Sequence, residues 1–242
     1  MIYILIPSFN EAANLQGLVK NISTFLKGNN KIYLIDDGSS DNTKEITRTL
    51  KNKFPIIRIG YDNNRGAGYA FKYGFNFVIP KLKNKDIVVT MEADNTTDYK
   101  ILNSLITIAK TGKVALASPH AQGGSFIGVT GYRIFLSRVA SILDSLIFRI
   151  KGVKTYSSFY RVYPANILID LKKHYKNEFI SHDGFPSVVE LLIRINKLGY
   201  QFIEIASKVD WTKRKGSSKM HLINSIKNHL KLYFEFARGQ LE

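Results

Sequence analysis

The chain has 242 residues, of which 45% are hydrophobic, and this is enough to bury one sizeable core. Its formal charge of +16 requires an anionic partner, such as a nucleic acid, a lipid surface or a phosphorylated small molecule. The absence of cysteine excludes disulfides and thiolate metal sites, so any metal ion must have oxygen or imidazole ligands.

The first residues run directly into an apolar stretch, without the basic segment and cleavage site of a signal peptide. A membrane-spanning helix needs about 20 predominantly apolar residues. The best candidate is interrupted by Arg133, Arg138, Asp144 and Arg149. We therefore expect a cytoplasmic chain that does not cross a membrane by itself.

The first half alternates short strand-like runs with helical stretches. The expected strands are residues 2–6, 32–35, 56–59, 87–91 and 114–117, and the expected helices are residues 11–26, 42–50, 68–78 and 99–109. This alternation predicts an α/β, Rossmann-like fold with a mostly parallel central sheet. Ligands of such sheets bind beyond the carboxyl ends of the strands, so the loops after the first, second and fourth strands are the candidate sites.

The first two of these loops allow both a structural and a functional interpretation. Asn10 suits the cap of a helix and Glu11 its first turn, and Asp41 suits the cap of the next helix. Alternatively, an acidic residue at the end of a strand, such as Asp36 or Asp37, can accept a hydrogen bond from a ribose hydroxyl or a base N–H. Either loop is explained by both interpretations.

The loop after the fourth strand contains Glu92 and Asp94. Residues two apart in an extended segment point to the same side, so both carboxylates can face one divalent cation. Oxygen ligands suit Mg²⁺ or Mn²⁺, which would neutralise the diphosphate of a leaving nucleotide. The alternative is that Asp94 and Asp98 cap the helix that follows.

The second half contains two amphipathic stretches, residues 132–150 and 222–236, whose apolar faces are bordered by basic side chains. A core-packing helix has the same pattern, but two such helices in a basic chain favour a membrane surface. We expect residues 1–220 to form the catalytic domain. Residues 221–242 would add a basic amphipathic helix to the same unit.

The three acidic loops occur in one chain with four further recognisable segments. These are NNRGAGYAFKYG (63–74), GYRIFLSR (131–138), YSSFYRVY (156–163) and the basic turn KRKGSSK (213–219). Together they resemble family 2 inverting glycosyltransferases of GT-A fold, in particular dolichyl-phosphate mannosyltransferases and bacterial polyprenyl-phosphate relatives. The resemblance extends over nearly the whole chain, and the amphipathic stretches would be interface helices of that fold.

The resemblance implies a role for each matching residue. Pro7, Phe9, Glu11, Ile35 and Asp37 would line the base and ribose; Glu92, Ala93 and Asp94 would hold diphosphate and metal; Lys213, Arg214, Ser218 and Lys219 would bind phosphates. In the implied mechanism Asp94, Arg161, Lys213, Arg214 and Lys219 carry catalysis, with Arg161 on the acceptor side. Three positions depart from the group: Glu92 replaces the usual Asp, and Pro119 and Lys213 each replace an Arg.

The implied donor is GDP-mannose or a UDP-hexose, and the implied acceptor is dolichyl or undecaprenyl phosphate. The enzyme would be peripheral on the cytoplasmic face of an anionic membrane, with a small membrane-spanning subunit as a further partner and no nucleic acid. One alternative is transfer to a saccharide hydroxyl, for which His182 and Asp183 would supply the base. The other is a catalytically inactive sugar-nucleotide-binding protein, which the residues at 92 and 119 suggest.

Overall fold

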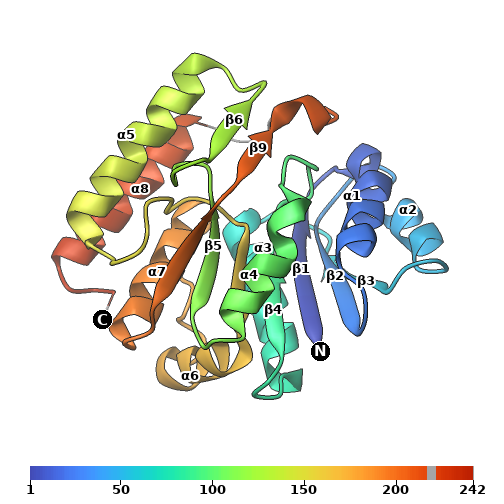
Figure 1. The fold of residues 1–242 in the computed structure, drawn as a ribbon, viewed down its shortest axis with the longest axis horizontal. Coiled ribbons are helices and arrows are strands. Elements are labelled where there is room, and N and C mark those ends of the chain that lie inside the picture. Colours follow the sequence, from blue (N-terminus) through green and yellow to red (C-terminus); the bar gives the residue numbers. More distant parts are fainter. Residues whose placement is uncertain (217–221, 242) are drawn as a thin grey trace.

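The computed structural model describes residues 1–216 and 222–241, and its strands form one large and one small sheet (Figure 1). The large sheet has the spatial order β3 (Ile56–Tyr61), β2 (Asn30–Asp37), β1 (Ile2–Ser8), β4 (Ile87–Thr90), β7 (Arg161–Pro164), β5 (Val114–Ser118) and β8 (Phe202–Ala206). Neighbouring strands are parallel, except that β7 is antiparallel to β4 and β5. The small sheet pairs β6 (Ser125–Ile127) with β9 (Lys208–Asp210). The predicted mostly parallel sheet is confirmed.

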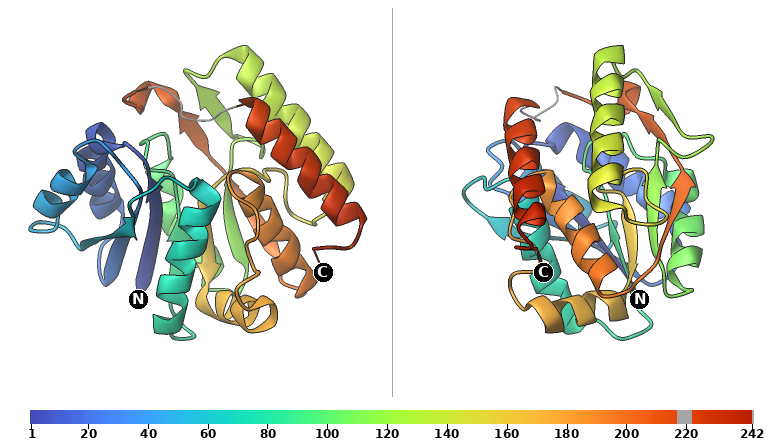
Figure 2. Two further views of the ribbon diagram at one scale, coloured as in Figure 1. Left: turned by 180° about the vertical axis from the view of Figure 1, so that it is seen from behind. Right: turned by 90° about the vertical axis from the view of Figure 1, so that its left-hand side faces the viewer.

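Helices cover both faces of the large sheet, giving three layers (Figure 2). On one face lie α1 (Ala12–Phe25), α2 (Thr43–Leu50) and α4 (Leu102–Ala109), and on the other α3 (Ala67–Val78), α6 (Ala165–Tyr175) and α7 (Pro186–Lys197). Two longer helices, α5 (Gly131–Phe148) and α8 (Leu222–Ala237), lie side by side beyond this second layer. Short 3-10 turns occur at Ile79–Lys81, Tyr99–Ile101 and Trp211–Lys213.

Strand alternation explains why the core has two parts. In β1, Tyr3 and Leu5 belong to the cluster under α3, α6 and α7, whereas Ile4 and Ile6 belong to the cluster under α1 and α4. Successive side chains of a strand point to opposite faces, so a strand that is buried on both faces is apolar throughout. This is why the apolar runs of the first half predict the parallel strands correctly.

Close packing of α3 on the sheet depends on a glycine of the segment 63–74. A Cβ atom at Gly74 would lie 2.4 Å from Ile35 Cδ1, so with a larger residue here either Ile35 or the helix would have to shift. The helix also begins after Gly66, whose φ of 88° favours glycine. The absence of a side chain at Gly74 thus lets α3 pack closely against the sheet.

Helix α8 is joined to α5 by a buried polar contact. Asp144 on α5 is 1% exposed and accepts a hydrogen bond from Tyr233 Oη of α8 at 2.8 Å. Phe148 and Phe236 stack edge to face beside this pair, and Leu232 is fully buried. Within the ranges 1–216 and 222–241, no helix combines the length and the apolar character needed to cross a membrane.

Candidate functional site

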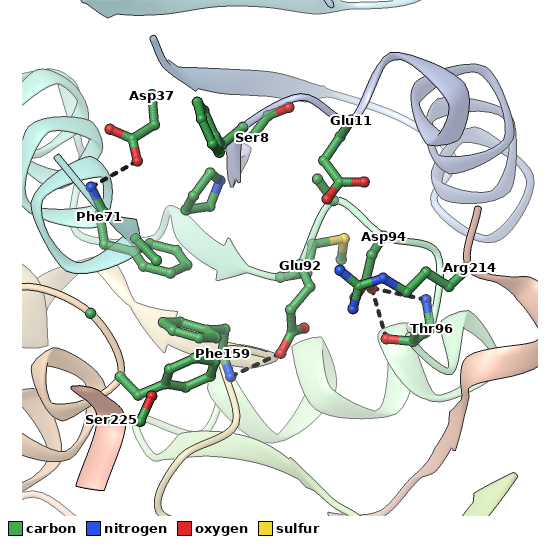
Figure 3. Close-up of a pocket in the computed structure, with 18 of the residues that line it drawn as sticks. Ser8, Glu11, Asp37, Phe71, Glu92, Asp94, Thr96, Phe159, Arg214 and Ser225 are labelled. Carbon is green, nitrogen blue, oxygen red and sulfur yellow. Dashed lines mark hydrogen bonds and ion pairs between the residues drawn. The ribbon is translucent and has the colours of Figure 1, made fainter. Parts of the chain in front are cut away.

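A cleft with a volume of about 830 Å³ opens at the carboxyl ends of β1, β2 and β4 (Figure 3). The predicted residues that line it are Pro7, Phe9, Glu11, Asp37, Glu92, Ala93, Asp94 and Arg214. They come from segments as far apart in the chain as Pro7 and Arg214. The topology thus brings all three acidic loops and part of the basic C-terminal turn to one place, as parallel strands require.

Asp37 is anchored by the segment that starts α3. Its Oδ1 accepts from Arg65 N at 2.8 Å, and its Oδ2 accepts from Gly66 N and from Asn64 Nδ2, both at 2.9 Å. Burial raises the pKa of the Asp37 carboxyl above its ordinary value, against the lowering effect of these donors. Asn64 also lines the cleft, although no role in the site is predicted for it from the sequence.

The expected cap of α1 by Asn10 is wrong. Asn10 has a φ of 53°, and its Oδ1 accepts from Ser40 N at 2.7 Å and from Asp41 N at 3.2 Å. Instead Asp41 Oδ2 accepts from Ala12 N at 3.0 Å, while its Oδ1 accepts from Thr43 N at 3.0 Å. The loops after β1 and β2 therefore support each other, and one aspartate bonds to the first turns of α1 and α2.

Glu92 and Asp94 lie on one wall of the cleft, as their spacing predicts. Glu92 Oε1 accepts from Phe159 N at 3.3 Å, and Asp94 Oδ1 accepts from Thr96 Oγ1 at 2.8 Å. Asp94 Oδ2 forms an ion pair with Arg214 Nη1 at 3.0 Å. Burial, together with the nearby charge of Asp94, raises the pKa of Glu92 to about 7.

This pair of carboxylates fits a divalent cation that arrives with a phosphate ligand. Among the described residues, no group of three or more His, Cys, Asp or Glu side chains is arranged as a complete metal cage. Mg²⁺ commonly binds through one or two carboxylates, and water and substrate phosphates complete its shell. The pKa of Glu92 is raised mainly by burial and also by the nearby charge of Asp94, and a cation between the two carboxylates would relieve the like-charge part.

Arg161 does not reach the cleft. It is 0% exposed on β7, where its guanidinium donates to Val188 O at 2.5 Å and to Tyr156 O. These contacts hold α7 and residue 156 to the sheet. The expected direct contact between Arg161 and an acceptor phosphate is therefore not supported by its position.

Two further predicted residues are placed away from the cleft, and two lie outside the described residues. Ile35 is fully buried in the core under α3, and the Lys213 side chain is 55% exposed and 3.5 Å from Asp210 Oδ2. Ser218 and Lys219 are the predicted residues outside the described ranges.

The cleft also contains residues that the sequence prediction missed. Phe159 lies near Glu92, and Ser225 and Asn228 of α8 form part of the wall. Trp211 is the only tryptophan of the chain, and its ring lies 5.1 Å from the Arg133 guanidinium and 5.7 Å from that of Arg214. A lone tryptophan within a basic segment is a sequence signal that could have indicated this wall.

His182 and Asp183 are not positioned as a base in the cleft. His182 is 8% exposed, with Nδ1 3.1 Å from Glu190 Oε2 and Nε2 2.8 Å from Glu235 Oε2. Asp183 is exposed, and neither residue lines the cleft described above. Both nitrogens of this imidazole thus face carboxylates that tie α7 to α8.

Solved structures share this architecture. Mannosyl-3-phosphoglycerate synthase from Rubrobacter xylanophilus matches 99% of this chain and 74% of its own, with a TM-score of 0.66 and 14% identity. Glucosyl-3-phosphoglycerate synthase from Mycobacterium tuberculosis, in complex with Mn²⁺, uridine diphosphate and phosphoglyceric acid, matches 96% of this chain and 78% of its own, with a TM-score of 0.65 and 15% identity. The predicted GT-A fold is confirmed.

Sequence comparison gives the family. Dolichol-phosphate mannosyltransferase from Pyrococcus furiosus is 28% identical over 195 residues, which are 79% of this chain and 52% of that protein. Undecaprenyl-phosphate mannosyltransferase from Micrococcus luteus is 23% identical over 220 residues, covering 89% of this chain and 86% of that one. The chain thus spans about half the length of the Pyrococcus relative. Because the model of glycosyl transferase family 2 matches residues 3–170, well over half of the sequence, the chain belongs to that family.

Proposed function

We propose that this chain transfers a sugar, with inversion, from a nucleoside-diphosphate sugar to a polyprenyl phosphate at a membrane surface. The observation that carries the proposal is the position of α8. One side of this helix contributes Ser225 and Asn228 to the cleft, while another side exposes Leu230 and Phe234. The names of the Pyrococcus and Micrococcus relatives, which specify dolichol phosphate and undecaprenyl phosphate, support this acceptor class.

The donor would lie along the carboxyl ends of β1, β2 and β4. Pro7, Phe9, Glu11 and Asp37 form the wall for base and ribose, and the diphosphate faces Arg214. The neighbouring Lys213, Ser218 and Lys219 would add phosphate contacts, as the family resemblance implies. A GDP-sugar or a UDP-sugar would fit this arrangement, since both present the same diphosphate.

Glu92 and Asp94 would hold Mg²⁺ or Mn²⁺ through their carboxylates. When bound, the cation neutralises the charge that develops on the leaving diphosphate. Arg214 contributes a second positive charge on the same side, because its guanidinium already lies 3.0 Å from Asp94 Oδ2. The Mn²⁺ in the mycobacterial structure belongs to a neighbour of the same fold and supports this choice of ion.

In the chemical step, a phosphate oxygen of the acceptor forms a bond to the anomeric carbon from the face opposite the donor diphosphate. The bond between that carbon and the diphosphate oxygen breaks, and the electron pair leaves with the nucleoside diphosphate. Because the acceptor phosphate is already anionic near neutral pH, the step needs no general base. This agrees with a cleft wall to which His182 and Asp183 do not contribute.

The membrane would be met by α5 and α8 together. Exposed large apolar side chains on these helices include Tyr132 at 64%, Phe135 at 61% and Leu146 at 64%, together with Ile142, Leu143, Ile226, Leu230 and Phe234. Lys227 and Lys231 lie on α8 and Arg238 directly follows it, and these side chains would contact anionic headgroups. The acceptor's isoprenoid could then stay in the bilayer while its phosphate enters the cleft beside α8.

The full proposal places the enzyme on the cytoplasmic face, with α8 acting as part of the catalytic unit and a small membrane-spanning subunit as a further partner. The test is a panel of GDP- and UDP-sugars with undecaprenyl or dolichyl phosphate in detergent, with Mg²⁺ or Mn²⁺ and product mass as the readout. We expect a glycosyl phosphopolyprenol. Transfer to saccharide hydroxyls alone, or nucleotide binding without transfer, would instead favour one of the two alternatives.

A further inference from the structure

The segment after β9 approaches α1 (Figure 1), and two of its residues line the cleft. We call residues 211–216 the strap. Trp211 and Arg214 of the strap line the cleft, and Lys215 reaches α1. The backbone before the strap is fixed where Asp210 N donates to Thr96 O at 3.0 Å. The strap therefore connects the small sheet to the layer that carries the donor loops.

The contact between the strap and α1 is a two-way amide pair. Asn14 Nδ2 donates to Lys215 O at 3.0 Å, and Asn14 Oδ1 accepts from Lys215 N at 3.0 Å. Asn14 is 1% exposed, and its Nδ2 also donates to Glu11 Oε2 at 2.6 Å. Its own carbonyl accepts from Asn95 Nδ2 at 2.8 Å, which fixes the first turn of α1 to the loop after β4.

Asparagine is an unfavourable residue for the stability of α1 at this buried position, unless its side chain also makes other contacts. Asparagine is a poorer helix former than leucine or alanine, and a buried amide costs stability unless its polar atoms are paired. At residue 14 both ends of the amide are used, and both reach the same strap residue, 201 positions away in the sequence. This pairing indicates that the side chain serves to hold the strap.

We propose that Asn14 is a positioning residue that latches the strap and thereby presents Arg214 to Asp94. Lys215 is adjacent to Arg214, so fixing its backbone restricts where the guanidinium can lie, and Arg214 Nη1 is found 3.0 Å from Asp94 Oδ2. Asn14 acts through the strap and does not itself line the cleft. The second half of this proposal, that the position of Arg214 serves the donor diphosphate, rests on the proposed function.

The latch can be tested without any ligand by limited trypsin digestion. Asn14→Ala removes both bonds to Lys215, and Asn14→Asp keeps the acceptor but loses the donor to Lys215 O. Gln16→Ala changes an exposed residue of the same helix and is the matched control. Cleavage after residues 213, 214 and 215, identified by fragment mass, should be about ten-fold faster in Asn14→Ala, because two hydrogen bonds are lost. Cleavage at the control rate in both variants overturns the latch.

The link to Arg214 is tested by a double-mutant cycle on nucleoside-diphosphate affinity, measured by calorimetry with Mn²⁺. Asn14→Ala should weaken binding by roughly ten-fold, and it should add little to Arg214→Ala, because the latch has no guanidinium left to position. Full additivity of the two effects would mean that Asn14 acts independently of Arg214, through helix stability or through its bond to Glu11, and would overturn the positioning role. Thermal unfolding of each variant checks that the protein is folded at the temperature of the binding measurement.

Failure of the proposed function gives a different pattern. If the wild-type chain bound no nucleoside diphosphate, the proposed donor site would be wrong, and the proteolysis alone would decide whether the latch exists. Rapid cleavage in Asn14→Asp but a normal rate in Gln16→Ala would then still support it. Equal rates in all four proteins would overturn both parts.

Discussion

The donor loops and the α5–α8 pair differ in whether their side chains find partners within the chain. Around the donor loops, buried charges are met inside the chain: Asp36 pairs with Arg58 at 2.6 Å, and Asp37 accepts from a side chain and two backbone amides. On α5, by contrast, Phe135 and Leu146 are more than 60% exposed. The donor loops hold their charged side chains in place without a partner molecule and suit a small polar ligand. The exposed apolar side chains of the α5–α8 pair would be buried only against another apolar surface.

The largest expected effect tests the donor region. Asp94→Asn keeps the size of the side chain but removes the charge that pairs with Arg214 and would hold the cation. We expect sugar transfer to fall about 10²- to 10³-fold, since stabilisation of the leaving diphosphate is lost. The control is Asp98→Asn, which removes a carboxylate of the same loop that accepts from Lys100 N. Equal loss in the two variants would remove Asp94 from the proposed mechanism.

The second prediction concerns the boundary between the regions. Arg161→Met removes a guanidinium that bonds to two buried carbonyls, so we expect the free energy of unfolding to fall by about 2 to 4 kcal/mol. Thermal and urea unfolding measure this. The acceptor KM of the remaining folded protein should change little. An unchanged stability with a large rise in acceptor KM would restore the role expected from the sequence.

These cases show what the sequence could predict and what it could not. Strands buried on both faces, such as β1 and β2, are recognisable in the sequence as apolar runs. The carboxylates that follow them lie at the same edge of the sheet, because the strands are parallel. β7 is a short antiparallel insertion between β4 and β5, and no local pattern specifies its partners. The position of Arg161 follows from that pairing. Its burial was therefore beyond sequence reasoning, as was the amide pair of Asn14 and Lys215.

The third prediction tests the apolar region. Phe135→Ser combined with Leu146→Ser should weaken binding to anionic liposomes by about 30-fold, since each exposed side chain contributes roughly 1 kcal/mol when it enters the bilayer surface.

The basic side chains of the same region are tested separately. Lys227→Gln with Lys231→Gln should weaken binding at low salt only, because salt screens the attraction between lysines and anionic headgroups. The charge-matched control is Lys20→Gln with Lys27→Gln, which changes one exposed lysine of α1 and one just after its end. Removing α8 is unsuitable, because Leu232 is buried.

For that liposome experiment, sedimentation at several salt concentrations is the measurement. If the apolar double variant binds as the wild type does, the exposed face of α5 is not a membrane contact. Full activity on a water-soluble acceptor would show that the cleft is intact in this variant. Loss of activity on both acceptor types would show that the two regions are not separable in the way their contacts suggest.

The smallest expected effect is a pH dependence that arises from Glu92, whose pKa is raised to about 7. Its carboxylate is mostly protonated at pH 6 and mostly ionised at pH 8, so metal-dependent nucleotide affinity should rise about ten-fold over this interval. The stability of the ligand-free protein depends on pH in the opposite direction. The folded state binds the proton more tightly than the unfolded state, so the contribution of Glu92 to stability falls as pH rises from 4.5 to 7. Calorimetry and melts of wild type and Glu92→Gln separate these trends from titration of the nucleotide. Parallel pH profiles in the two proteins would show that Glu92 takes no part in binding the cation.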